Sequence, residues 1–258
     1  MKQVDVTAYI DDRSEQVAMP SSRHPSRSGT LLEFAEPVPY AEAWCLQIRL
    51  REKRAADHGP DTLLLLEHSP VYTVGRTTQA SHWNSREERL PHARIQIHPV
   101  DRGGSVTYHG PGQLVGYPIL RLSHYASGPR QYVRMLEDVL IGTLQSWGLE
   151  GYRVDKKPGV WIRLDGQEAK IAAIGVRIER GVTLHGFALN VNMDLSPFSR
   201  IVPCGLTGCR ITSMAEALGS TLSLAGVRSV LQHAFSRTFN IQWTSVTTAQ
   251  LAETVSTG

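Results

Sequence analysis

The feature that most constrains the fold is a series of three predicted β-strands joined by tight turns, between residues 159 and 191. The first strand, Gly159-Val160-Trp161-Ile162, leads into Asp165-Gly166, a pair typical of two-residue hairpin turns. In the second, from Lys170 to Ile178, apolar side chains recur at alternate positions, as in a strand with one buried face. Glu179-Arg180-Gly181 then reverses the chain into a third strand, 182–191. Strands connected this tightly pair antiparallel, so the sequence predicts an antiparallel meander.

Apolar residues at helical spacing predict helices around this meander, and short leucine-rich or β-branched runs predict further strands. The expected helices cover residues 40–55, 133–147, 213–219 and 224–239, and the other expected strands include 63–66, 71–74 and 241–243. This pattern indicates an α+β fold in which helices flank a mixed, mostly antiparallel sheet. We expect one domain over residues 30–245, a flexible extension over residues 1–29 and a polar tail over residues 246–258.

The composition argues against several functional classes. The formal net charge of +3 is too small to predict a nucleic-acid partner. No apolar run reaches the roughly 18 residues that a membrane-spanning helix needs. The N-terminus lacks the layout of a secretory signal, and three cysteines cannot all pair with one another. Reduced thiols and a cytoplasmic location are therefore expected, with no membrane partner.

A glycine-rich stretch over residues 101–118 carries the first group of candidate site residues. Its sequence is DRGGSVTYHGPGQLVGYP, in which five glycines and two prolines surround Arg102, Tyr108 and His109. Glycines allow the backbone to approach a ligand closely, so that N–H groups and a few polar side chains surround it. The stretch contains neither a dinucleotide-binding fingerprint nor a phosphate-binding P-loop. A ligand site and a tight hairpin with polar edges are both compatible with this pattern.

Two further residues have unusual surroundings in the sequence. Lys170 begins an otherwise apolar strand, where a buried ammonium group is unfavourable unless a neighbouring group stabilises it. Cys204 lies between Pro203 and Gly205, an arrangement that presents its sulfur at a turn. Together they fit a thiolate nucleophile whose pKa is lowered by a cation. Alternatively, Lys170 lies in solvent at the end of its strand and Cys204 fills a turn as a small apolar residue.

Other kinds of catalytic centre fit the sequence less well. Cys204 and Cys209 do not have the usual spacing of zinc ligands, and His98, His109 and His185 are scattered, so no metal site is expected. Cys209 is assigned to packing. A serine hydrolase is disfavoured because the sequence has no G-x-S-x-G motif.

Residues 102–113, RGGSVTYHGPGQ, resemble the signature of the lipoyl(octanoyl) transferases. Further motifs of that family are PVYTVGR at 70–76, KIAAIG at 170–175, HGFALN at 185–190 and PCG at 203–205. The resemblance covers residues 31 to 240 and implies a biotin/lipoate protein ligase-like fold. It also implies the first step of endogenous protein lipoylation, in which an octanoyl group passes from octanoyl-acyl carrier protein to a lysine of a lipoyl domain. The implied acceptors are the E2 subunits of 2-oxoacid dehydrogenases and the glycine cleavage H protein.

By position in these motifs, the resemblance implies that Cys204 is catalytic and holds the octanoyl group as a thioester. It implies that Lys170, the other catalytic residue, lowers the pKa of that thiol. The implied substrate-binding residues are Arg102, Gly103, Gly104, Ser105, Val106, Thr107, Tyr108, His109, Ala173, Ile174, Gly175, Gly186, Phe187 and Ala188. No cofactor is implied. Two alternatives stay open: an ATP-dependent lipoate or biotin ligase, which would not need Cys204, and a non-catalytic module that binds acylated or lipoyl domains.

Overall fold

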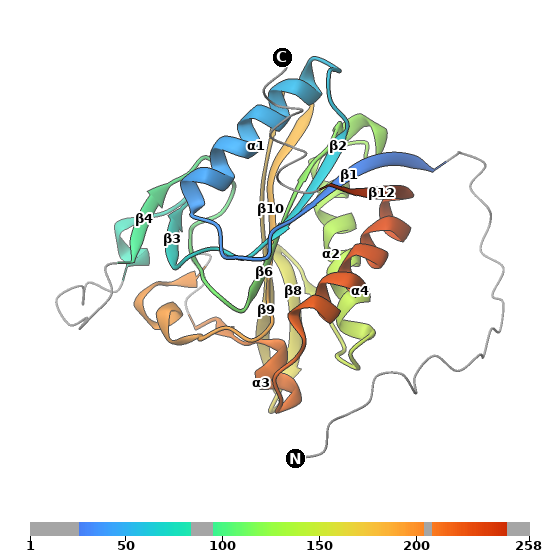
Figure 1. Ribbon diagram of the computed structural model, residues 1–258. Coiled ribbons are helices and arrows are strands. Elements are labelled where there is room, and N and C mark those ends of the chain that lie inside the picture. The colour runs from blue at the N-terminus through green and yellow to red at the C-terminus, as the bar shows by residue number, and fades with distance from the viewer. Residues whose placement is uncertain (1–25, 84–94, 204–207, 247–258) are drawn as a thin grey trace, which may run out of the picture.

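The computed structural model describes residues 26–83, 95–203 and 208–246, which form two sheets with helices around the larger one (Figure 1). The larger sheet has the strand order β12-β1-β2-β6-β10-β9-β8-β7, and β11 pairs with β9. Its strands are β1 (Arg27–Glu33), β2 (Asp61–Leu66), β6 (Gln113–Ile119), β7 (Tyr152–Val154), β8 (Lys157–Leu164), β9 (Gln167–Glu179), β10 (Val182–Asn190), β11 (Arg210–Ile211) and β12 (Ile241–Val246). The smaller sheet has the order β4-β3-β5, with β3 (Val71–Val74), β4 (Gln96–Pro99) and β5 (Val106–His109).

Strands β8, β9 and β10 form the predicted antiparallel meander. Both connecting turns have two residues, and φ is positive at all four positions: 50° and 77° at Asp165-Gly166, and 50° and 76° at Arg180-Gly181. Positive φ at both central residues defines the turn type whose twist matches the twist of a hairpin. These local sequence signals therefore determine the register of the central strands.

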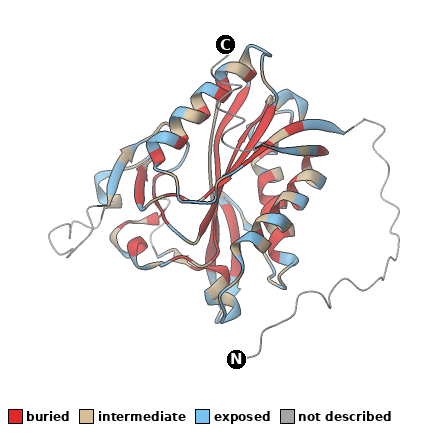
Figure 2. Cartoon of the chain, viewed as in Figure 1, coloured by how far each residue is buried: buried red, intermediate tan, exposed pale blue. Residues whose placement is uncertain are grey.

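Helices cover both faces of the larger sheet, as Figures 1 and 2 show. On one face, α1 (Tyr40–Ala55) packs on a cluster that includes Leu64 and Leu66. On the other, α2 (Pro129–Gln145) and α4 (Leu224–Phe239) pack on a cluster that includes Leu63 and Leu65. Successive side chains of a strand point to opposite faces, so the run of four leucines in β2 is buried on both sides. The α+β prediction with a mixed, mostly antiparallel sheet is confirmed.

The first and last strands of the described chain lie side by side at one edge of this sheet. β1 pairs in parallel with β12 on one side and with β2 on the other. β1 begins at Arg27, inside the range 1–29 that the sequence assigned to a flexible extension. Residues 1–25 of that extension and residues 247–258 of the predicted tail lie outside the described residues.

The short helix α3 (Met214–Leu218) begins directly after Ser213, whose side chain caps its N-terminus. The Ser213 hydroxyl accepts a hydrogen bond from the Glu216 backbone N–H at 3.1 Å. The Glu216 carboxylate accepts from the Thr212 hydroxyl at 2.8 Å instead of returning to the backbone of the cap residue. The cap therefore depends on the serine alone.

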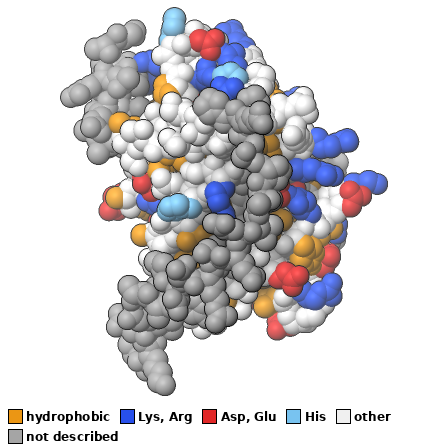
Figure 3. Space-filling view, turned by 90° about the vertical axis from the view of Figure 1, so that its right-hand side faces the viewer, with side chains coloured by type: hydrophobic (Ala, Val, Ile, Leu, Met, Phe, Trp, Pro, Cys, Tyr) orange, Lys and Arg blue, Asp and Glu red, His pale blue; other side chains and the backbone are white. Residues whose placement is uncertain are grey.

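The surface carries charges of both signs. In Figure 3, Lys and Arg side chains gather at one edge of the face shown, with Asp and Glu side chains next to them. Among the ion pairs of the described residues, Arg153 pairs with Glu137 at 2.8 Å and with Asp138 at 2.5 Å. Within the described ranges, no helix is both long and apolar enough to cross a membrane.

Candidate active site

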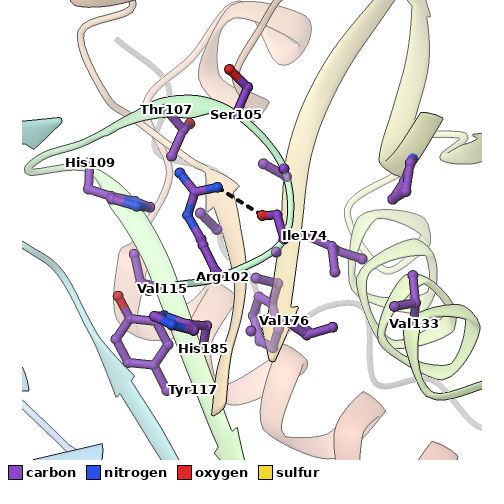
Figure 4. Close-up of a pocket in the computed structure, with 18 of the residues that line it drawn as sticks. Arg102, Ser105, Thr107, His109, Val115, Tyr117, Val133, Ile174, Val176 and His185 are labelled. Atoms are coloured by element: carbon purple, nitrogen blue, oxygen red, sulfur yellow. Dashed lines mark hydrogen bonds between the residues drawn. The ribbon is translucent and has the colours of Figure 1, made fainter. Parts of the chain in front are cut away.

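A cavity of about 260 Å³ lies beside the part of β9 that is not paired with β8. β8 pairs with β9 only between Gln167 and Ala172, so the following residues, 173–176, line the cavity instead of pairing with β8. The glycine-rich loop closes one side of the cavity, and Val133 approaches from α2 on the other (Figure 4). An incomplete strand pairing thus creates the space.

Backbone hydrogen bonds hold the glycine-rich loop against the sheet. The Gly103 N–H donates to the Val176 carbonyl at 3.1 Å, and the Thr77 N–H donates to the Gly104 carbonyl at 3.2 Å. Gly75 is required at this contact, because a Cβ atom there would stand 2.2 Å from the Gly104 oxygen. Gly75, in the motif at 70–76, therefore allows the glycine-rich loop to pack closely against this motif.

Most of the predicted site residues line this single cavity. They are Arg102, Gly103, Gly104, Ser105, Thr107, His109, Lys170, Ala173, Ile174, Gly175, Gly186, Phe187 and Ala188. The structure does not bring Val106 and Tyr108 to it. These two alternate with Thr107 and His109 along β5 and pack instead in a cluster with Tyr72 and Phe198.

Several lining residues were not predicted from the sequence. They are Tyr40, Val115, Tyr117, Val133, Lys156, Lys157, Pro158, Val176 and His185. Four of them had a local signal: His185 begins the motif at 185–190, Val176 continues the apolar alternation of β9, and Val115 and Tyr117 belong to the glycine-rich stretch 101–118. The others come from α1, α2, the β7–β8 turn and the start of β8, which only the folded topology brings together.

Lys170 is buried, with 3% of its surface exposed, so the alternative that placed it in solvent is wrong. Its side chain lines the main cavity and also a smaller one, of about 10 Å³, whose wall includes Asn190, Phe198 and Pro203. The pairing of β8 with β9 shifts register between Val160 and Trp161, opposite Lys170. Such a bulge changes the direction of neighbouring side chains. Lys170 therefore sits at the junction of the two cavities.

Cys204, the predicted nucleophile, lies outside the described residues. The described chain reaches Pro203, which is buried and forms part of the smaller cavity beside Lys170. Cys209 donates a hydrogen bond from its Sγ to the Arg210 carbonyl at 3.7 Å.

Buried tyrosines and histidines form the polar side of the cavity, and His68 lies behind it in contact with the lining residue Tyr117. His68 Nδ1 lies 2.8 Å from the Val38 carbonyl, and His68 Nε2 lies 2.6 Å from the Tyr117 hydroxyl. Burial lowers the pKa of His68 to about 4, so the imidazole is neutral at neutral pH. Burial likewise raises the pKa of Tyr40 to about 12. These groups thus act as neutral hydrogen-bonding partners.

His185 adds an unusual backbone conformation to this polar side. Its φ is 56° in the middle of β10, a region that residues other than glycine rarely adopt. Its Nε2 lies 2.9 Å from Asp101, whose carboxylate also pairs with Arg177. Burial and the nearby charges of Arg102 and Arg177 lower the pKa of His185 to about 3. We therefore assign a neutral imidazole that donates to the carboxylate.

Comparison with known proteins agrees with this geometry. A sequence profile described as the lipoyl protein ligase A/B catalytic domain matches residues 39–236. The octanoyltransferase of Syntrophotalea carbinolica is 46% identical over 198 residues, which cover 77% of this chain and 89% of that protein. The octanoyltransferase of Rubrobacter xylanophilus is 49% identical over 200 residues, with 77% and 88% covered.

Solved structures show the same fold at lower sequence identity. A bipartite lipoate protein ligase from Thermoplasma acidophilum superposes with a TM-score of 0.64 at 18% identity, covering 89% of this chain and 90% of that one. A lipoate-protein ligase A bound with ATP gives a TM-score of 0.64 at 19% identity, with 88% and 92% covered. The predicted ligase-like fold is confirmed. By its sequence relatives, the chain belongs to the octanoyltransferases of the lipoyl protein ligase A/B catalytic-domain family.

Proposed function

We propose that this protein transfers an octanoyl group from octanoyl-acyl carrier protein to a lysine of a lipoyl domain, through a thioester on Cys204. The acceptors are the lipoyl domains of 2-oxoacid dehydrogenase E2 subunits and the glycine cleavage H protein. The relatives' common name supports the octanoyl group, and the sequence motifs support the cysteine and the two partners.

One observation carries this proposal: Lys170 shares a small cavity with Pro203, the residue before Cys204. Cys204 follows Pro203 directly in the sequence. An ammonium group near a thiol favours the thiolate, the form that attacks a thioester. An ATP-dependent ligase mechanism would not need a cysteine at this position.

The reaction divides into two acyl transfers. In the first, the Cys204 thiolate attacks the octanoyl carbonyl, the bond from that carbonyl to the carrier's sulfur breaks, and the carrier leaves as a thiol after taking a proton. In the second, the acceptor lysine amine attacks the new thioester, the bond from the carbonyl to Cys204 breaks, and an amide forms. Lys170 donates the first proton and, once neutral, accepts the one that the amine loses.

The cavity has an apolar side that suits an eight-carbon chain. Val133, Ile174, Val176 and Phe187 line it from α2, β9 and β10. Burying each methylene of the chain contributes about 0.8 kcal/mol of binding free energy. The polar groups at His185 and Tyr40 lie along the same cavity, so they limit the length of apolar chain that fits.

The test is the intact mass of the full chain after incubation with octanoyl-acyl carrier protein and no ATP. We expect an octanoyl adduct that hydroxylamine removes and that passes to an added lipoyl domain. Cys204→Ser should abolish the hydroxylamine-sensitive adduct while the circular dichroism spectrum stays unchanged. An adduct that forms only with ATP would show a ligase instead.

A further inference from the structure

Two lysine side chains share one indole ring at the inner side of the cavity. The Nζ atom of Lys170 lies 5.5 Å from the centroid of the Trp161 ring, and the Nζ atom of Lys157 lies 5.4 Å from it. Both lysines line the cavity, whereas Trp161 is buried behind them with 2% of its surface exposed. An aromatic face attracts an ammonium group within about 6 Å of its centroid. The ring therefore favours one position for each charge.

The backbone fixes this ring in place. Trp161 in β8 stands opposite Lys170 in β9. Its indole Nε1–H donates a hydrogen bond of 3.2 Å to the Lys157 carbonyl, at the start of the same strand. Turning the ring away from Lys170 would break this partly buried hydrogen bond, so the indole forms a rigid surface.

The route of the Lys170 side chain to the ring depends on a glycine. Gly159 has a φ of 119°, and a Cβ atom there would stand 2.7 Å from Cε of Lys170. The aliphatic part of Lys170 thus passes across the Gly159 α-carbon before its ammonium group reaches the indole. Because the register shifts next to Lys170, strand alternation does not set this direction.

We propose that Trp161 is a positioning residue, whose indole holds the Lys170 ammonium group at the junction of the two cavities. The ring also favours the charged form of the lysine, which is the form that stabilises a neighbouring thiolate. The distances given above establish the contact between Trp161 and Lys170. Its role in catalysis rests on the function proposed above for Lys170.

The contact can be tested without any acyl transfer, because the chain has only five lysines. In the full chain labelled with ¹³C-lysine, ε-methylene NMR signals over an indole face are shifted upfield. We expect two shifted signals, assigned by their loss in Lys157→Arg and Lys170→Arg. In Trp161→Leu the Lys170 signal should return to its ordinary position, and in Trp161→Phe it should keep part of the shift. A Lys170 signal that is unshifted, or unchanged in Trp161→Leu, overturns the proposal.

Should Trp161→Leu fail to fold, the Lys170 signal in Trp161→Phe decides the same question, because a benzene ring should keep part of the upfield shift.

The catalytic part is tested by the rate of Cys204 acylation in single-turnover experiments. Trp161→Leu should lower the rate constant roughly tenfold or more and leave the KM for the donor unchanged. If Trp161→Leu transfers at the normal rate while Lys170→Met does not, the positioning role is wrong and the proposed function stands. If Lys170→Met also transfers at the normal rate, the role proposed for Lys170 fails, and the positioning role fails with it.

Discussion

At the scale of single residues, the sequence could identify the two chemically unusual side chains but not their surroundings. Lys170 and Cys204 stand out because their neighbours in the sequence are unusual for their residue types. Lys170 lies in an otherwise apolar strand, and Cys204 lies between a proline and a glycine. Tyr40 and Val133 line the same cavity with no such sign, since a tyrosine at the start of a helix and a valine within one are ordinary core residues. Their role follows only from which elements meet.

The charge of Lys170 should control the reactivity of Cys204. We expect Lys170→Met, which keeps the buried volume and removes the charge, to raise the pKa of the thiol. The rate of iodoacetamide alkylation should then rise with pH at higher values than in the unmodified protein. The matched control is Lys53→Met on α1, which should leave the profile in place. Equal profiles for all three proteins would remove Lys170 from its proposed role.

The volume on the apolar side of the cavity should affect the preferred chain length. Val133→Phe adds volume on the α2 side and should shift the preference from octanoyl towards shorter acyl groups. The measurement is kcat/KM for donors with six, eight and ten carbons. Each methylene excluded should lower the ratio by about fourfold, if it contributes about 0.8 kcal/mol. An unchanged preference would show that Val133 does not bound the chain.

At the scale of elements, local turn signals decided which strands could be predicted. The β8–β9 and β9–β10 hairpins can be predicted because each has a two-residue turn with a glycine, which readily adopts the positive φ that such a turn needs. The parallel pairing of β1 with β12 has no equivalent signal, because their residues are more than two hundred positions apart. The pairing of β8 with β9 ends at Ala172, and this end opens the cavity. Its position depends on where the β7–β8 turn lies, which the sequence does not signal either.

Two glycine-to-alanine changes should have opposite effects on stability. In Gly186→Ala the new Cβ would stand 2.1 Å from the Gly116 carbonyl oxygen, so β10 and β6 would have to separate, at about 2 kcal/mol or more. In Gly142→Ala, inside α2, the nearest atom is 3.9 Å away, and helix propensity should stabilise the protein by about 0.5 to 1 kcal/mol. Urea unfolding measures both, and a destabilised Gly142→Ala would contradict the open space found in α2.

At the scale of the whole molecule, the buried imidazoles link stability to pH. His68 has a pKa of about 4 in the folded protein and an ordinary value of 6.5 when unfolded. Between these values the unfolded chain binds a proton that the folded chain does not, so the free energy of unfolding falls as the pH falls. For His68 alone the slope is about 1.4 kcal/mol per pH unit, and His109 and His185 act in the same direction.

His68→Gln should therefore flatten the acid side of the stability curve. Urea unfolding between pH 7 and pH 5 should show a smaller loss of stability in the variant than in the unmodified protein, by about 1 kcal/mol or more. Both proteins have the same carboxylates, which contribute equally to the two curves of stability against pH. The difference between the curves therefore comes from the His68 imidazole. Parallel curves would mean that His68 binds its proton equally well in the folded and unfolded states.

The pairing of β1 with β12 has a consequence for synthesis on the ribosome. β1 leaves the ribosome more than two hundred residues before its outer neighbour in the sheet, residues 241–246. Until then one side of β1 presents unpaired backbone groups, which favour contact with other chains. This side of the sheet is thus completed only after residues 241–246 have been translated. From then on β1 is an interior strand, and β12 takes its place at the edge of the sheet.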